Sequence, residues 1–433
     1  MKPPPRTLAE WLAVQEQVHT RAIDLGLGRV GAVARTLGVD RPAYRVITVG
    51  GTNGKGSTVA TLEAVLQAQG RRTGTLTSPH LLRYNERIHV AGREATDAQL
   101  VGVFDRIEAA RGATTLTFFE YNTLAALLLF ADEKVDVAVL EVGLGGRLDA
   151  VNLVDADVAV LCSVGFDHRD WLGDTLDAIG REKAGIFRAH RPAVLGTSEM
   201  PASVYAAIEE LGAQPVIAGR HFSWRIDEDH APRSWSYRGL QGEIAALPAP
   251  RLAGAIQYRN AATALAAVEA LGRAAGTAMR PAPLTREVIA AGLEGVALAG
   301  RFQVIPGPVE WILDVSHNEP AAQVLQANLA ARPVSGRTLA VCAILQDKDA
   351  GAIARVLHGA ADIWIACALA GPRGGTAAQL AARLAPAVHA TEQAASVAEG
   401  CARARALARP GDRVLVFGSF GTVTAALEWL QLQ

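Results

Sequence analysis

One stretch of the sequence decides the fold of this chain: Val46-Ile47-Thr48-Val49-Gly50-Gly51-Thr52-Asn53-Gly54-Lys55-Gly56-Ser57-Thr58. A β-branched run ends in a glycine-rich loop that carries one lysine and two hydroxyl side chains, and a helix-like segment, 59–69, follows. Glycines let backbone N–H groups converge on an anion, and the N-terminus of a helix adds the positive end of its dipole. Lys55 supplies a point charge, and Ser57 is a hydroxyl that can ligate Mg²⁺. The stretch therefore predicts a binding site for nucleotide phosphates.

The loop departs from the usual phosphate-binding pattern G-x-x-x-x-G-K-[ST], because Gly56 stands between Lys55 and Ser57. A flexible turn would account for the glycines alone. It would not account for the strand, the lysine, the hydroxyls and the helix together, so we keep phosphate binding as the prediction.

The composition indicates a globular protein without an electrostatic footprint for nucleic acid or anionic lipid. At about 150 residues per domain, 433 residues allow two or three domains. The net charge is −1, and the longest apolar run, 124–131, is far shorter than the roughly 20 residues of a membrane span. The N-terminus leads into no signal-like core, and the four cysteines have no metal-binding spacing. We expect a cytoplasmic protein with buried thiols, monomeric by default, with neither a nucleic acid nor a membrane as partner.

The order of β-rich and helical segments predicts two α/β domains. Strand-like runs alternate with helices in the first half, at 45–49, 72–76, 135–142, 157–164 and 192–195, and have little period-2 alternation. Such runs are typical of parallel strands covered on both faces. Residues 222–247 predict a small antiparallel appendage and 260–271 a helix. A second series has strands near 309–315, 338–345, 362–366 and 413–417. We place the boundary near Ala297, which gives a mostly parallel P-loop-type domain, 1–296, and a smaller Rossmann-like domain, 297–433.

Polar groups follow several of these strands, at the edge of the sheet where ligands bind in α/β folds. Glu141 stands near the end of one strand, His168 follows the next strand along the chain, and Ser78 follows the run 72–76. Together they make a plausible Mg²⁺ shell, although one ligand is a nitrogen. Taken singly, Glu141 is a capping carboxylate as readily as a ligand, and a loop histidine is more often structural. The run Gly143-Leu144-Gly145 is a weak dinucleotide signal, because Leu148 occupies the third glycine position.

Four further polar residues have two open interpretations. Lys183 lies in Gly180-Arg181-Glu182-Lys183-Ala184-Gly185, which looks like the end of a helix, and alone it reads as a solvated or ion-paired lysine. Arg301, Asp314 and His317 lie near the start of the second domain and at a strand end. Either phosphate binding or packing between domains would account for them.

In their order along the chain, these motifs resemble the folylpolyglutamate synthase/dihydrofolate synthase family, within the wider Mur-ligase-like amide-bond formers. The resemblance covers both domains nearly end to end. The matching stretches are 23–27, 51–58, 78–81, 116–121, 141–152, 167–168, 181–187, 260–263, 300–303 and 314–318. One departure is that Glu319 separates Asn318 from Pro320 where the family often has His-Asn-Pro, which affects the geometry expected around His317.

The resemblance implies a Mur-ligase-like fold, ATP and Mg²⁺ as cofactors, and a role for each matching residue. It implies that Thr52, Asn53, Gly54 and Lys55 hold the ATP phosphates, and we include Gly56 and Ser57 of the same loop in the predicted nucleotide site. It assigns Mg²⁺ to Ser78, Glu141 and His168, and Ser57 is the further ligand that the loop pattern itself predicts. Lys183 matches a lysine that is carboxylated in the family, and a carbamate there would offer oxygen ligands to a second Mg²⁺. Further nucleotide contacts are implied for Asn260, Arg301 and Asp314, with Arg301 and Asp314 reaching across from the second domain. We add His317, from the matching stretch 314–318, to the predicted nucleotide contacts. The implied pterin pocket consists of Asp24, Leu25, Gly26, Leu27, Thr117, Phe118, Phe119, Glu120, Leu148, Asp149 and Ala150.

The implied activity is an ATP-dependent ligase that joins L-glutamate to dihydropteroate and to reduced folates through an acyl phosphate. Lys55, Glu141, His168 and Lys183 are its expected catalytic residues, since phosphoryl transfer needs positioning and charge neutralisation more than a protein nucleophile. Three alternatives stay open. A Mur-type ligase acting on a cell-wall precursor usually has an additional N-terminal domain, and only about 45 residues precede the loop here. A second is an enzyme with folylpolyglutamate synthase activity only. A P-loop kinase or nucleotide switch would leave the second domain unexplained.

Overall fold

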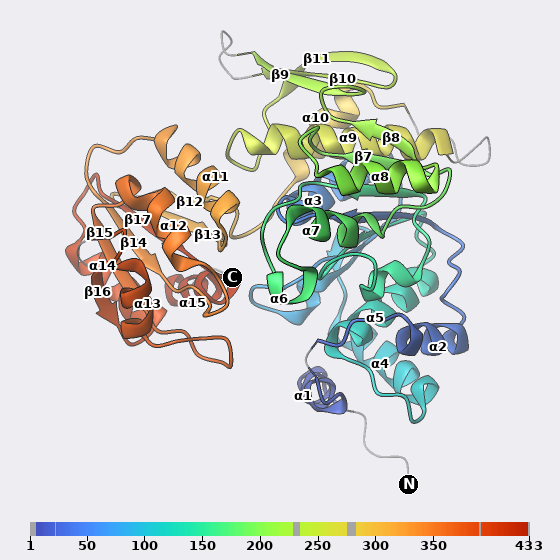
Figure 1. Ribbon diagram of the computed structural model, residues 1–433, viewed down its shortest axis with the longest axis horizontal. Coiled ribbons are helices and arrows are strands. Elements are labelled where there is room, and N and C mark those ends of the chain that lie inside the picture. Colours follow the sequence, from blue (N-terminus) through green and yellow to red (C-terminus); the bar gives the residue numbers. More distant parts are fainter. Residues whose placement is uncertain (1–5, 22, 228–233, 275–282, 389–390, 432–433) are drawn as a thin grey trace. The chain divides into compact units, whose positions relative to one another are not determined.

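The structure is a computed structural model that describes residues 6–21, 23–227, 234–274, 283–388 and 391–431 (Figure 1). The chain divides into two compact units. The first consists of residues 1–251 and 258–296, and the second of residues 252–257 and 297–433. Each unit has its own sheet, flanked by its own helices.

The first unit is built on a mostly parallel sheet that has eight strands within the described residues, in the order β4-β3-β2-β5-β1-β6-β7-β8. Six of these run parallel to one another: β2 (Thr73–Leu76), β5 (Val137–Glu141), β1 (Arg45–Gly50), β6 (Val158–Leu161), β7 (Pro192–Leu195) and β8 (Gln214–Ile217). β3 (Ile88–Val90) and β4 (Arg93–Glu94) extend the sheet in antiparallel pairing.

The register of the central strands fixes where their loops meet. Val49 of β1 stands opposite Glu141 of β5, and Gly50 stands opposite Leu161 of β6. The carboxyl ends of β5, β1 and β6 therefore lie at one edge of the sheet. In an open parallel sheet this is the edge at which ligands bind.

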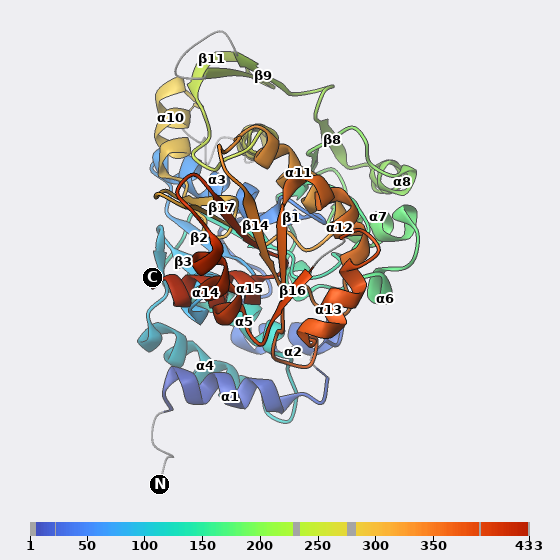
Figure 2. The same cartoon turned by 90° about the vertical axis from the view of Figure 1, so that its left-hand side faces the viewer.

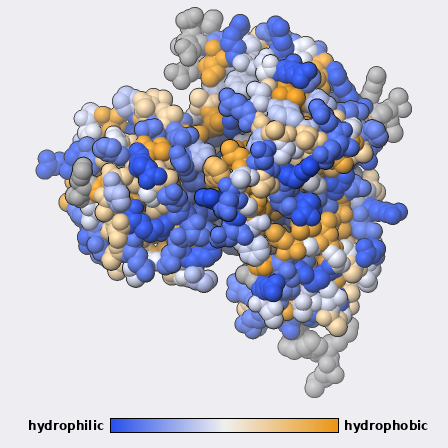
Figure 3. Space-filling model, viewed as in Figure 1, coloured by the Kyte–Doolittle hydropathy of each residue, from blue (hydrophilic) through white to orange (hydrophobic). Residues whose placement is uncertain are grey.

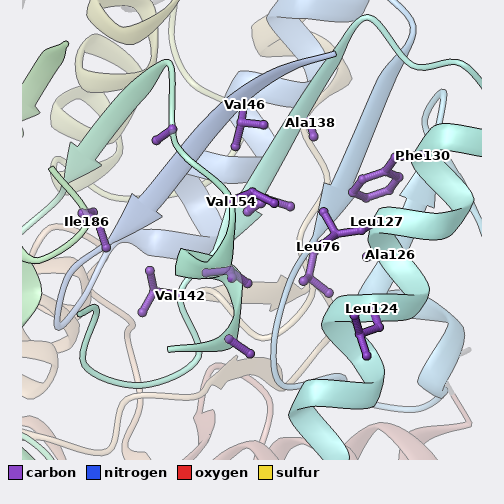
Figure 4. Packing of buried hydrophobic residues seen from close by; sticks show 14 of the residues in the cluster. Val46, Leu76, Leu124, Ala126, Leu127, Phe130, Ala138, Val142, Val154 and Ile186 are labelled. Atoms are coloured by element: carbon purple, nitrogen blue, oxygen red, sulfur yellow. The ribbon is translucent and has the colours of Figure 1, made fainter. Parts of the chain in front are cut away.

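Helices cover both faces of this sheet, because successive strand residues point to opposite sides. Val46 and Ala138 belong to a core cluster that includes residues of α5, and Figure 4 shows both in this cluster together with Leu127 and Phe130 of that helix. Ile47 and Val49 belong to the opposite core, built with α3, α9 and α10. The helices of the unit are α1 (Leu8–Val18), α2 (Gly28–Leu37), α3 (Lys55–Ala68), α4 (Asp97–Arg111), α5 (Phe118–Asp132), α6 (Arg169–Leu172), α7 (Leu176–Ala184), α8 (Ala202–Leu211), α9 (Ile256–Ala274) and α10 (Arg286–Gly295), with short 3₁₀ turns η1 (Tyr84–Arg87) and η2 (Ala150–Leu153).

A small antiparallel sheet packs on the first unit, as predicted for 222–247. It consists of β9 (Ser223–Asp227), β10 (Ser234–Gly239) and β11 (Gly242–Pro248). Tyr237 of β10 is fully buried, and its hydroxyl donates to the Glu269 carboxylate of α9 at 2.8 Å. Figures 1 and 2 both place this sheet at the end of the unit opposite α1, α2 and α4.

The second unit is a smaller α/β layer structure. Its sheet has the order β12-β13-β17-β14-β15-β16 in the described residues, with β12 alone antiparallel to its neighbour. The strands are β12 (Gln303–Ile305), β13 (Glu310–Asp314), β14 (Thr338–Cys342), β15 (Ile363–Cys367), β16 (Thr391–Ala394) and β17 (Arg413–Phe417). The helices are α11 (Glu319–Ala330), α12 (Ala350–Leu357), α13 (Ala377–Leu384), α14 (Val397–Leu407) and α15 (Phe420–Leu430), with the turn η4 (His358–Ala360).

The predicted fold class is confirmed, and the corrections concern short elements and one boundary. The helix after the glycine-rich loop begins at Lys55 and not at Val59, because Gly54 takes a positive φ of 92° and the helical backbone starts directly after it. The sequence reading missed β3, β4, β8, β12 and β16, which are only two to four residues long. All four cysteines are buried and free, as expected for the three that stand in or beside apolar runs. Among the described helices, none has the length and apolarity to cross a membrane, and Figure 3 shows hydrophilic residues on both units.

Candidate active site

The glycine-rich loop joins β1 directly to α3 at the carboxyl edge of the sheet. Gly51 has a φ of 141°, and a Cβ there would lie 3.1 Å from the backbone nitrogen of Ser163, so only glycine fits this close approach. Gly54 precedes α3 and no side chain caps that helix. The N–H groups of the first turn, at Lys55, Gly56 and Ser57, are therefore available to an anion, and the helix dipole favours negative charge there.

Hydrogen bonds to the loop after β6 hold the glycine-rich loop in shape. The Thr52 hydroxyl accepts from the Gly165 N–H at 3.0 Å and donates to the Gly165 carbonyl at 3.1 Å. The Asn53 N–H donates to the Ser163 hydroxyl at 3.1 Å. Lys55 Nζ donates back to the Gly51 carbonyl at 3.0 Å, which keeps the ammonium group over the loop. The conformation of the loop is therefore preorganised for a ligand, and the Thr52 hydroxyl stabilises it by its two hydrogen bonds to Gly165.

Asn260 approaches the same loop from α9. Its Oδ1 lies 3.0 Å from the point at which a Cβ on Gly54 would stand, and the residue is buried. The structure therefore brings together the predicted phosphate loop and one of the predicted nucleotide contacts, although 206 residues separate them (260 − 54).

Two of the predicted metal ligands meet at the ends of β2 and β5. Glu141 is only 4% exposed, and its Oε2 accepts a hydrogen bond from the Ser78 N–H at 3.2 Å. Ser57 lies buried in the first turn of α3. His168 precedes α6 in the left-handed backbone region, at a φ of 51°, and its N–H donates to Asp167 Oδ1 at 2.9 Å.

The residues at this edge fit a hard divalent cation better than a soft one. Within the described chain, no three His, Cys, Asp or Glu side chains converge as a preformed metal cluster. Glu141 nevertheless offers a desolvated carboxylate beside the Ser78 backbone, and carboxylate and hydroxyl oxygens are the ligands that Mg²⁺ and Mn²⁺ prefer. A site of this kind is completed by substrate phosphates and water, as is usual for Mg²⁺.

Lys183, near the end of α7, is 5% exposed. Burial, and then the charge of Lys55, lowers the pKa of Lys183 to about 7, while Asp167, Asp149 and Glu182 act in the opposite direction. A substantial fraction of the side chain is therefore a neutral amine at neutral pH, unlike an exposed lysine.

The loop 143–150 packs against the end of α7. The Arg147 N–H donates to the Glu182 carbonyl at 2.9 Å, and a Cβ on Gly146 would lie 2.8 Å from the Lys183 carbonyl oxygen. Asp149 is fully buried in the same loop, and burial raises its pKa to about 7 against the opposing effect of N–H donors and of Lys55. Its Oδ2 accepts from the Leu144 N–H at 2.8 Å. Leu148 is partly buried, and Ala150 begins the turn η2.

Arg29 ties together the first two segments of the predicted pterin pocket. Its Nη1 lies 2.6 Å from Asp24 Oδ2, and its Nη2 donates to the Asp24 carbonyl at 2.8 Å and to Glu120 Oε1 at 3.3 Å. The other Glu120 oxygen accepts from the Thr117 N–H at 2.7 Å, and the Thr117 hydroxyl accepts from the Glu120 N–H. Thr117 and Glu120 thus form a capping box at the start of α5. Their side chains shape the segment, and Leu25, Gly26 and Leu27 follow Asp24 in the loop that Arg29 holds.

Two phenylalanines connect the start of α5 to the remaining loops. A Cβ on Gly143 would lie 2.8 Å from Phe119 Cζ, so the absent side chain makes room for this ring. Phe118 packs edge-on against Tyr84, with ring centroids 5.6 Å apart. The side chains of Arg29 and Phe119 therefore connect the predicted pterin segments 24–27 and 117–120 to each other and to the loop 143–150, which contains the third segment.

The remaining predicted nucleotide contacts lie in the second unit. Asp314 ends β13, and its two oxygens accept from the N–H groups of Phe302 and Ser316, at 2.7 and 2.8 Å. The Arg301 guanidinium lies 5.1 Å from the centroid of the Phe420 ring. His317 Nδ1 is 2.8 Å from the Val315 carbonyl oxygen. These contacts order the start of the unit.

Glu319, which separates Asn318 from Pro320 where the family often has His-Asn-Pro, is part of helix α11. Asn318 caps this helix by accepting from the Ala321 N–H at 3.0 Å, Glu319 is its first residue, and Pro320 lies in its first turn. Proline is well tolerated at this position, because the backbone N–H that it lacks would have no acceptor within the first turn of the helix.

Sequence reasoning missed two arginines of the first unit. Arg29 bridges the predicted pterin segments, and Arg87, at the end of η1, is 8% exposed between Phe118 and Tyr84. A single arginine in a loop has no motif around it. Burial and partners from distant segments reveal its role.

Comparisons with known proteins agree with this geometry. Residues 49–268 match the model of the Mur ligase middle domain, and residues 300–420 match that of the Mur ligase, glutamate ligase domain. The dihydrofolate synthase/folylpolyglutamate synthase of Escherichia coli is 44% identical over 97% of this chain and 95% of its own length.

Two solved structures share the whole architecture. The E. coli FolC structure in complex with DHPP and ADP has a TM-score of 0.91 and 43% identity, and the match covers 99% of both chains. A bifunctional folylpolyglutamate synthase/dihydrofolate synthase with Mn, AMPPNP and L-glutamate bound has a TM-score of 0.89 and 41% identity, over 100% of both chains.

Proposed function

The chain belongs to the dihydrofolate synthase/folylpolyglutamate synthase family of Mur-type ligases, and from this premise we propose how its residues carry out the reaction. It is an ATP-dependent ligase that joins L-glutamate to dihydropteroate and to reduced folates. ATP and a divalent cation are its cofactors. The observation that carries the proposal is that the phosphate loop, the Glu141–Ser78 pair and the three pterin segments belong to one unit and gather around the carboxyl edge of its sheet.

The reaction has two steps. A carboxylate oxygen of the pterin acid or folate attacks the terminal phosphorus of ATP, which gives an acyl phosphate and ADP. The amino group of glutamate then attacks the acyl carbon, the amide bond forms, and phosphate leaves with the bonding electrons. Neither step needs a protein nucleophile, which accords with a site of N–H groups, lysines and carboxylates.

The chain's own residues position the reactants. The N–H groups of the first turn of α3 bind nucleotide phosphates, and Lys55 neutralises their charge. A divalent cation, when bound, neutralises phosphate oxygens, and Glu141, His168, Ser57 and Ser78 are the residues we propose to hold it. The segments held by Arg29 and Phe119 bind the pterin acid. Asn260, Arg301, Asp314 and His317 remain the proposed further nucleotide contacts, and a monomeric, cytoplasmic enzyme remains a prediction.

The proposed function predicts that ATP use depends on both other substrates. We expect the purified protein to release ADP in step with glutamylated product when glutamate is supplied with dihydropteroate, and again with tetrahydrofolate. Omitting glutamate should stop product formation in both cases. The measurement is ADP release together with the mass of the product, and a Lys55→Met variant controls for contaminating ATPases.

The possible outcomes separate the alternatives. Glutamylation of tetrahydrofolate with no product from dihydropteroate would leave only the elongating activity. A protein that forms neither product, yet hydrolyses ATP, would contradict the ligase assignment.

A further inference from the structure

Arg87 is a buried cation for which the mechanism above has no use. It ends η1, directly before β3, and only 8% of the residue is exposed. Burial lowers the pKa of its guanidinium, but an arginine side chain stays charged at neutral pH even so. A buried charge is costly unless a partner compensates it.

The protein partners of Arg87 account for only a small part of its bonding capacity. Its Nε donates to His80 Nδ1 at 2.7 Å. Its guanidinium carbon lies 5.2 Å from the centroid of the Phe118 ring and 5.6 Å from that of Tyr84. A guanidinium has five N–H donors, so four of them, on Nη1 and Nη2, have no acceptor within the part of the chain that the structure describes.

The neighbouring acidic groups do not neutralise this charge. Both carboxylate oxygens of Glu86 accept from the backbone N–H groups that precede it, at residues 81–83, each at 2.7 Å. Glu141 is near enough to influence the pKa of Arg87, yet among the described residues neither it nor any other carboxylate forms an ion pair with Arg87. His80 supplies no negative charge, because its Nδ1 accepts the hydrogen bond from Arg87 Nε as part of a neutral imidazole ring.

The surroundings of the free donors indicate what they would bind. Phe118 belongs to a predicted pterin segment, and Glu141 and Ser78 belong to the predicted cation site. A planar guanidinium binds a carboxylate through two parallel hydrogen bonds, and the rings of Phe118 and Tyr84 offer apolar surface to an aromatic group. A carboxylate attached to an aryl group therefore matches the site in both charge and shape.

We propose that Arg87 binds the carboxylate of the pterin acid, the group that is activated by ATP. This inference rests on the proposed function and adds a substrate-binding residue to it. Arg87 receives the carboxylate between the aromatic rings of Phe118 and Tyr84 and near Glu141, which places the reacting oxygen at the edge where the phosphates bind. The interaction also supplies the anion that compensates the buried guanidinium.

The test compares dihydropteroate with the analogue that has hydrogen in place of its carboxylate. Binding of both to the full chain is measured with AMPPNP and Mg²⁺ present, for the wild type and for Arg87→Met, which keeps an apolar stem against the two rings. We expect the wild type to prefer the acid, and the variant to bind the acid about 10- to 100-fold more weakly, since it loses charge-assisted hydrogen bonds. Affinity for the decarboxylated analogue should be nearly the same in both proteins.

A matched control lies four residues away. Arg83 is exposed and pairs with Glu94 at 2.5 Å, so Arg83→Met removes a cation from the same turn and should leave both affinities unchanged. Circular dichroism checks the fold. Arg87→Lys keeps the charge without the planar fork and should be intermediate, which serves as the test if Arg87→Met does not fold.

Each outcome has one meaning. If Arg87→Met is folded and keeps the wild-type preference for the acid, the inference is wrong. It is also wrong if the variant loses affinity only for AMPPNP, which would assign Arg87 to phosphate binding. If Arg87 had a purely structural role, the variant would bind the acid and its decarboxylated analogue more weakly by the same factor, and this result would also overturn the inference. A wild-type protein that binds neither pterin compound would overturn the proposed function itself.

Discussion

Replacing Glu141 by alanine is expected to abolish both glutamylation activities while the protein stays folded. The carboxylate is 4% exposed, ends β5, and lies beside the Ser78 N–H at the edge where phosphates are proposed to bind. Losing a ligand of the divalent cation removes several kcal/mol of transition-state stabilisation, so turnover should fall on the order of 10²-fold or more. Steady-state kinetics at saturating Mg²⁺ measures the effect.

Two further variants make the result specific to the charge of Glu141. Glu141→Gln keeps the shape of the side chain and should lose activity to a similar extent. Glu133 lies before β5, at the opposite end of that strand, and pairs with Arg72, so Glu133→Ala should turn over normally. Near-normal turnover of Glu141→Ala would show that this carboxylate holds no essential cation.

Lys183→Ala is also expected to inactivate the enzyme, and a short carboxylic acid such as acetate should restore part of the activity. The buried amine has a pKa of about 7, so it can react as a neutral amine with CO₂ and become a carbamate. The carbamate would present oxygens where the unmodified side chain presents a cation. Activity with and without acetate is the measurement. The control is Arg181→Ala: this exposed arginine lies on the same helix as Lys183 and pairs with Glu210 of α8.

The sign of the pH dependence follows from the lowered pKa. Below pH 7 the amine is mostly protonated and cannot form a carbamate, whereas above pH 7 the neutral form dominates. Incorporation of ¹³C-labelled bicarbonate, followed by NMR, should therefore rise as the pH increases through 7. An unmodified amine at pH 8 with bicarbonate present, or the absence of any acetate rescue, would count against the carbamate.

Much of this site could be predicted because its polar side chains lie at the carboxyl ends of parallel strands. Ser78 and Glu141 are 63 residues apart, yet Ser78 follows β2 and Glu141 ends β5, two strands that pair directly, and the structure places the two residues in hydrogen-bond contact. The same reasoning finds the phosphate loop, since the glycines, lysine and helix are contiguous in the chain. Where a function depends on consecutive residues or on the order of parallel strands, pattern and topology suffice.

The residues that sequence reasoning missed or interpreted incompletely depend on side chains from distant segments. Arg29 contacts Glu120, which is 91 positions away in the sequence, and no sequence pattern near either residue predicts this contact. Thr117 and Glu120 were predicted as substrate contacts, although Thr-x-x-Glu before an apolar run is also the signature of a capping box, which the structure contains. The burial of a side chain is the second property that the sequence pattern does not reveal. It separates Lys183 and Arg87 from the many exposed lysines and arginines, and no local pattern reports it.

The central claim is that one site in the first unit carries out both reactions. The most direct test measures dihydropteroate as an inhibitor of tetrahydrofolate glutamylation, with labelled glutamate and separation of the two products. The account predicts competitive inhibition against tetrahydrofolate, with an inhibition constant equal to the KM of dihydropteroate in its own reaction. Undiminished tetrahydrofolate glutamylation at dihydropteroate concentrations far above that KM would contradict a single site.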